Sequence, residues 1–225
     1  MRVTHFISLA ETAFMAGTTE REISALLVDR VLAPLLICDG DAERLVPMVA
    51  PVASFCLATH GCLTPWGQAR VIRTLIERIE AREDFELFLG LHEQLGSTDF
   101  DWTVTWSCIT ADMWPFVVAS LGRATQMAHA RSVIQSDPQV MGGMPCFSGT
   151  RLPVANLLAL KKGGLGFPAL KAAYPFLTEE LVKAAEVYAI VSATPSQVAT
   201  LELMNTEGKL IRKKVVRTKD GELGD

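Results

Sequence analysis

The chain has 225 residues, 49% of them hydrophobic, which is enough for one large domain or two small ones with packed cores and excludes a disordered protein. Its net charge of −4 lacks the basic balance that is typical of strong nucleic-acid binders. The five cysteines show no C-x-x-C spacing, so we interpret them as buried thiols in a reducing compartment, not as a disulfide framework.

The N-terminal segment predicts two short helices and no export signal. Ser8 with Glu11 forms a capping box that starts the first helix, and Gly17 supplies the left-handed residue that ends it. A second box, Thr19 with Glu22, starts the next helix after a turn of about three residues. The spacing of small, glycine and β-branched residues here resembles the helix-turn-helix motif; these positions are Ala13, Gly17 and Ile23.

An antiparallel hairpin is expected to follow the two helices. Two apolar runs, 35–38 and 44–46, flank the turn signal Asp39-Gly40. The N-terminal region is therefore predicted to be a winged helix-turn-helix.

In that arrangement the second helix enters the major groove with its N-terminal residues leading. The candidate DNA contacts are Thr18, Thr19, Arg21 and Ser24 on the second helix, together with Arg44 on the hairpin. However, Met1–Val46 holds four basic and seven acidic residues, a net charge of −3, whereas phosphate binding requires the opposite sign. Basic residues elsewhere, or dimerisation, must supply the attraction, and the alternative is a helix pair that binds no DNA.

The sequence in the middle of the N-terminal region predicts helices that form the hydrophobic core. Residues 45–63 carry no Lys, Arg, Asp or Glu, but Pro47 and Pro51 interrupt them, so a buried core helix is expected instead of a membrane span. Residues 65–81 read as an amphipathic helix capped by Thr64. A loop-rich stretch around 96–99 and a helix near 112–128 complete the region.

No catalytic site is readable from the sequence. Cys56, His60 and Cys62 offer three metal ligands where structural zinc takes four, so a core role is expected for them. The glycine-rich run 143–149 lacks the lysine of a phosphate-binding loop. No Ser-His-Asp or paired-carboxylate arrangement is visible around the four histidines, so we expect no enzyme activity, metal or cofactor.

The second region contains an ordered series of short motifs. It begins with an extended segment, 132–136, and a turn-rich run, and it continues as three short helices that predict a trihelical, helix-turn-helix-like unit. The motifs in chain order are Asp137-Pro138, Gly142-Gly143-Met144-Pro145, Gly149-Thr150-Arg151, Tyr174-Pro175 and Tyr188-Ala189. This order, over residues 131–193, resembles the family called domain of unknown function 433.

The resemblance implies a function. Proteins with a helix-turn-helix-like N-terminal region and this C-terminal domain are similar to VapB-type antitoxins of type II toxin-antitoxin pairs. That implies a PIN-like, metal-dependent ribonuclease toxin as partner and repression of the operon by binding its promoter. Arg151 is a candidate partner contact, and its alternative role is a hydrogen bond to the turn carbonyls of its own domain.

A basic tail ends the chain. Between Lys209 and Lys219 there are six basic residues and no acid, which favours a flexible interaction arm. Arg212, Lys213, Lys214 and Arg217 are candidate partner contacts that would pair with clustered carboxylates of a nuclease. A solubilising or DNA-contacting tail is the alternative.

The predicted fold is mainly α: a helix-turn-helix-containing domain at 1–130 with a small hairpin, a trihelical domain at 131–195 and a basic tail at 196–225. The predicted function is that of a cytoplasmic, homodimeric antitoxin that binds a toxin and operator DNA. Two alternatives stay open: a protein-interaction module without DNA binding, and a stand-alone ligand-sensing regulator. The last would need a cavity lined by aromatic residues such as Phe55, Trp66, Phe88 and Trp102.

Overall fold

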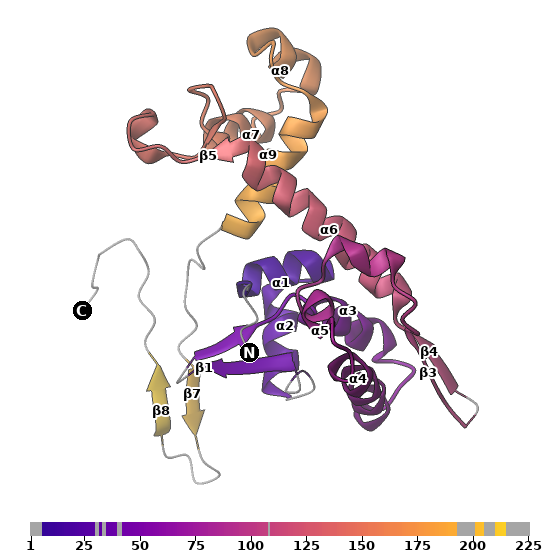
Figure 1. Ribbon diagram of the computed structural model, residues 1–225. Coiled ribbons are helices and arrows are strands. Elements are labelled where there is room, and N and C mark those ends of the chain that lie inside the picture. Colours follow the sequence, from indigo (N-terminus) through magenta and orange to yellow (C-terminus); the bar gives the residue numbers. More distant parts are fainter. Residues whose placement is uncertain are drawn as a thin grey trace. The chain divides into compact units, whose positions relative to one another are not determined.

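The computed structural model describes residues 6–29, 32, 35–39, 42–107, 109–192, 201–204 and 210–214, and these are mainly helical, as predicted (Figure 1). By its internal contacts the chain divides into two units, Met1–Val191 and Ser192–Asp225, and each is described by itself. Within the described residues, every sheet consists of two antiparallel strands.

The N-terminal helices begin where their capping boxes predict. α1 spans Leu9–Ala16 and α2 spans Glu20–Val28, and both boxes are formed. Strands β1 (Leu36–Asp39) and β2 (Ala42–Leu45) follow and pair antiparallel, which is the predicted hairpin. Ile7 extends this pair, since its N–H donates to the carbonyl of Leu45 at 3.0 Å.

The uncharged run forms the buried helix α3, Val49–Thr59. Pro51 lies in its first turn, where a helix does not need the missing N–H, so the proline is tolerated. Val49, Ala50 and Ala53 are fully buried. Among the described residues, no helix is long and apolar enough to cross a membrane.

Helix α4, Pro65–Glu80, packs its apolar stripe into the core as predicted, and the Thr64 hydroxyl accepts a hydrogen bond from the N–H of Gly67 at 3.2 Å. Its buried Gln68 donates from Nε2 to the Cys56 carbonyl at 2.8 Å and to the Thr59 hydroxyl at 3.0 Å. These two bonds connect α4 to α3.

The segment between α4 and α6 contains more regular structure than predicted. Helix α5 (Phe85–Leu89) and a 3₁₀ helix (Glu93–Ser97) precede a hairpin of β3 (Thr103–Trp106) and β4 (Ile109–Asp112). Aromatic rings of this segment pack at tilted angles around the buried Phe88, whose ring centroid lies 4.8 Å from that of Phe100 and 5.8 Å from that of Trp102.

Helix α6 spans Trp114–Val133 and packs on α1 and α3. It is longer than predicted, and it includes the start of the segment that was expected to be extended. Only Ile134–Gln135 form a strand there, β5, which pairs with β6 (Cys146–Phe147). The expectation of an extended segment over 132–136 was therefore wrong for its first two residues.

Three helices follow β6, as predicted: α7 (Val154–Lys162), α8 (Phe167–Ala173) and α9 (Glu179–Ser192). The chain leaves α7 through Gly164, whose φ is +93°, a value that glycine adopts without strain. The hydroxyl of Thr178 accepts a hydrogen bond from the N–H of Leu181 at 3.2 Å and so caps α9.

Two apolar cores lie within residues 1–191, and α9 contributes to both. One core, called the head core below, lies among α1 to α6; the other lies among β5 to α9. On α9, Ala184, Val187 and Val191 belong to the head core, and Val182 and Ala185 belong to the second core. The predicted boundary at residue 130 falls inside α6, which runs through it without a break. The division into domains at that point stays a prediction.

In the second unit, β7 (Leu201–Met204) pairs antiparallel with β8 (Leu210–Lys214). This strand pair lies in the tail that was predicted to be a flexible interaction arm, and the flexibility of the tail stays a prediction.

Candidate functional site

The turn between α1 and α2 is fixed by local bonds and by α6. Gly17 has a φ of +71°, and the N–H groups of Gly17 and Thr18 donate to Phe14 and Ala13 at 3.0 and 2.9 Å. The guanidinium of Arg123, on α6, donates to the Met15 carbonyl at 3.1 Å. The end of α1 is therefore capped both by glycine and by a side chain that lies more than a hundred residues away in sequence.

The N-terminus of α2 is occupied by its own acidic residue. Glu22 accepts hydrogen bonds from the hydroxyls of Thr18 and Thr19, the latter at 2.8 Å, and from the N–H of Thr19 at 3.0 Å. These bonds to the charged form lower the pKa of Glu22 to about 2, with the Thr18 hydroxyl as the largest cause. A carboxylate thus lies where a DNA phosphate would approach, and it accepts the hydrogen atoms of both candidate hydroxyls.

The other candidate DNA contacts differ in their availability. The Ser24 hydroxyl donates to the Glu20 carbonyl at 2.8 Å within the helix. Arg21 is exposed and, in the described part of the chain, forms no hydrogen bond or ion pair. Arg44 lies on β2, and its side chain is outside what the structure describes. Of the candidates on α2, only Arg21 presents a free donor group.

Sequence reasoning missed a link between α1 and α6. Glu11, which is 7% exposed, accepts the Ser8 N–H in the capping box and also forms an ion pair with Arg131 of α6. The box was visible in the sequence because its residues lie three apart. The arginine, 120 residues away, has no local signal that would reveal it.

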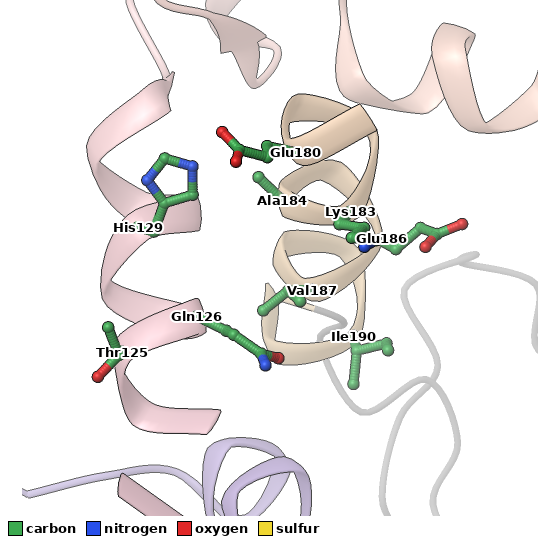
Figure 2. A pocket seen from close by; sticks show the side chains of 9 residues that line it. All are labelled: Thr125, Gln126, His129, Glu180, Lys183, Ala184, Glu186, Val187 and Ile190. Atoms are coloured by element: carbon green, nitrogen blue, oxygen red, sulfur yellow. The ribbon is translucent and has the colours of Figure 1, made fainter. Parts of the chain in front are cut away.

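A cavity of about 710 Å³ lies between α6 and α9 and was also not predicted. Figure 2 shows His129 and Gln126 on the α6 wall, facing Glu180 and Val187 on α9. Ile190, 52% exposed, lines this cavity and a second one of about 380 Å³ beside the α1–α2 turn. The end of α9 therefore borders the α1–α2 turn.

The motif region around Arg151 forms a shallow pocket of about 400 Å³ with polar and apolar walls. The Asp137 carboxylate accepts the Gln139 N–H at 2.9 Å, and Gly143 and Gly149 have φ of +86° and +72°, as the turn signals predicted. Arg151 is exposed, and within the described residues it makes no bond to a turn carbonyl. Its guanidinium is thus available to an acidic group.

Three of the four candidate tail contacts lie on β8, where Arg212, Lys213 and Lys214 pair in register with Leu203, Glu202 and Leu201. Arg217 lies outside the described residues. The structure therefore gives the backbone position of three of these basic residues.

The two cysteines Cys56 and Cys62 differ in burial. Burial raises the pKa of Cys56 to about 12, so it is a protonated thiol at neutral pH, whereas Cys62 is exposed and not buried as expected. No group of three His, Cys, Asp or Glu side chains able to hold a metal occurs in the part of the chain that is described.

The aromatic residues proposed for a ligand cavity do not share one. Phe55, Phe88 and Trp102 are buried in the head core, while Trp66 is 67% exposed. The cavity lining that the ligand-sensing alternative would need is therefore not formed by these four residues, because three of the rings pack in the core and the fourth faces solvent.

Comparison with known proteins gives two likenesses. The family described as "Protein of unknown function (DUF433)" matches residues 134–189, from β5 into α9. The chain is 24% identical over 187 residues to "Uncharacterized protein y4eO" of Sinorhizobium fredii (strain NBRC 101917 / NGR234), covering 83% of this chain and 81% of that one. No solved structure matches the chain. Residues 134–189 are therefore a segment similar to DUF433, as the sequence motifs suggested.

Proposed function

We propose that this protein is the antitoxin of a type II toxin-antitoxin pair, which binds and neutralises a PIN-like ribonuclease toxin and represses its own operon by binding DNA. The observation that carries the proposal is the combination of an α1–α2 helix-turn-helix and hairpin with a DUF433-like segment in one chain. Its role is non-enzymatic and cytoplasmic, and a homodimer would place two helix-turn-helix units on two half-sites.

In the DNA-binding half of the proposal, α2 lies in the major groove and Arg21 makes the first contact. Arg21 is exposed at the second position of the helix and is free to reach a phosphate or a guanine edge. Because Thr18 and Thr19 donate to Glu22, they reach DNA only if that carboxylate releases them.

In the toxin-binding half, basic groups of this chain pair with the carboxylates that hold the metal of the nuclease. Arg151 lines a pocket and forms no hydrogen bond or ion pair with another described residue, and the tail supplies Arg212, Lys213, Lys214 and Arg217. An arginine that binds a carboxylate in bidentate fashion competes directly with a metal ion for its oxygens.

The test is co-expression of this chain with the product of the adjacent gene, followed by pull-down at moderate salt and a ribonuclease assay. A stoichiometric complex that suppresses the neighbour's ribonuclease activity supports the antitoxin role. Absence of a complex, with promoter DNA still bound, would overturn it in favour of a stand-alone transcription factor. A chain that ends at Asn205 tests the tail: undiminished inhibition would assign neutralisation to Arg151 and the DUF433-like segment.

One observation favours a second function, a protein-interaction module without DNA binding: Glu22 occupies the N-terminus of α2. Glu22→Gln separates the two functions. Glutamine retains the capping box but removes the charge, so binding to promoter DNA should become tighter if α2 meets phosphate. A DNA affinity that is absent in both forms, with toxin binding intact, supports the interaction module.

A further inference from the structure

One face of α4 carries an exposed tryptophan beside two arginines. The indole of Trp66 is 67% exposed, and the guanidinium carbon of Arg70 lies 5.5 Å from its centroid. Arg73, on the next turn, is exposed as well. Together with Ala69 and Thr74 these side chains line a hollow of about 240 Å³, called the α4 face below.

The α4 face is held on a rigid support. The opposite side of α4 is buried in the head core, which also includes Ile23 of α2, so α4 and the helix-turn-helix share one packed body. Gln68 is bonded to α3, and Arg78 donates to the Thr103 carbonyl of β3 at 2.6 Å. α4 therefore presents its exposed side chains from a fixed position relative to α2 in the same helical head (Figure 1).

The two arginines of this face differ from four other arginines of the head, whose guanidinium groups are bonded. Arg78, Arg82, Arg123 and Arg131 each bond to a carboxylate or a carbonyl. Arg70 and Arg73 form no ion pair or hydrogen bond within the described ranges, and exposed Glu77, one turn beyond Arg73, pairs with neither. Two guanidinium groups are therefore available to a ligand.

We infer that the α4 face binds the backbone of double-stranded DNA, with Arg70 and Arg73 on phosphates and Trp66 against the adjoining sugar. The inference rests on the DNA-binding half of the proposed function and supplies what α2 lacks, since Met1–Val46 is acidic and phosphate contacts dominate affinity. Side chains three apart on a helix lie about 5–6 Å apart at Cβ, so both guanidinium groups reach one strand. Arginine pairs with phosphate in bidentate geometry, and its planar group stacks on the indole without losing that ability.

The test is a salt titration of binding to a labelled duplex that spans the promoter of this chain's gene, with a scrambled duplex of equal length alongside. Arg70→Gln/Arg73→Gln should weaken binding to both duplexes alike and reduce the slope of log K against log salt by about 2, one per lost phosphate contact. Lys162→Gln, an exposed change on α7, is the control and should leave the slope unchanged.

A second readout uses the indole itself. DNA should quench the fluorescence of the wild type, and most of that change should vanish in Trp66→Phe, since Trp66 is exposed whereas Trp102 is buried and Trp106 and Trp114 are half-buried. An unchanged salt slope in a folded double variant overturns the inference while leaving the proposed function intact. Failure of the wild type to bind either duplex overturns both this inference and DNA binding, whereas toxin binding is decided independently by the pull-down.

Discussion

Gly17 is under two separate constraints, and both oppose a side chain there. Its φ is +71°, and a Cβ would lie 2.4 Å from the Arg123 guanidinium. Gly17→Ala should therefore lower the free energy of unfolding by about 1–3 kcal/mol, through backbone strain and displacement of Arg123. Chemical denaturation measures the change.

Gly122→Ala is the matched control for that variant. Gly122 lies inside α6, and a Cβ there meets nothing within 4 Å, so alanine should stabilise the protein by about 0.5–1 kcal/mol. In Gly17→Ala/Arg123→Ala the clash is absent, and what remains is the backbone strain together with the lost hydrogen bond from Arg123 to the Met15 carbonyl, which Arg123→Ala alone measures. Equal effects of both glycine variants would contradict the role assigned to Gly17.

Glu22 should make the stability of the protein depend on pH in the acidic range. Its folded-state pKa of about 2 lies below the ordinary value of 4.5, so its contribution is fully present above pH 4.5 and is lost as the pH falls toward 2. Between pH 6 and pH 3 the melting temperature of the wild type should therefore fall further than that of Glu22→Gln. If the melting temperatures of the two proteins fall by the same amount, the hydrogen bonds from Thr18 and Thr19 do not stabilise the charged form of Glu22 when the protein is in solution.

At the scale of elements, the parts that the sequence predicted are those with a local signal. Capping boxes placed the starts of α1 and α2, an Asp-Gly pair placed the β1–β2 hairpin, and Thr64-Pro65 placed the start of α4. Each signal lies within a few residues of the structure it specifies, because caps and turns are bonds between near neighbours.

The β3–β4 hairpin lacked such a signal. Trp106 pairs with Ile109, so the loop holds two residues, and Ser107 adopts a φ of +52° where glycine or asparagine is usual. The end of α6 was misplaced for a related reason: the β-branched pair Val133-Ile134 favours a strand, but the helix continues through Val133. Tertiary packing, and not local preference, sets both features.

The pairing of α1 with α6 leads to a double-mutant prediction. Glu11→Ala removes both a capping partner and an ion pair, and should cost about 2 kcal/mol. Arg131→Ala leaves the Ser8 bond in place and should cost less than about 1 kcal/mol, because Arg131 is half exposed. A coupling energy near zero in the denaturation cycle would contradict a direct link between these helices.

For the whole molecule, the candidate site could be predicted only in part. The positions of Arg21 and Arg151 on exposed surfaces follow from local pattern, since one begins a capped helix and the other follows a glycine turn. Sequence spacing does not show that the hydroxyls of Thr18 and Thr19 donate to Glu22. It also does not show that Arg70 lies exposed beside Trp66, because both features depend on side-chain geometry. The sequence therefore predicted which residues could bind a ligand, but not which of their side chains are free to do so.

The sharing of α9 by two cores predicts that the head and the DUF433-like segment unfold together. All four tryptophans lie between residues 66 and 114, so their fluorescence reports on the head alone. Leu157 on α7 is fully buried in the second core, and Leu157→Ala should cost about 2–5 kcal/mol there. Because Ala184 and Val187 of α9 belong to the head core, that loss should also lower the midpoint of the tryptophan transition, in step with the far-UV circular dichroism. A tryptophan midpoint that stays at its wild-type value would instead support two independent domains divided near residue 130.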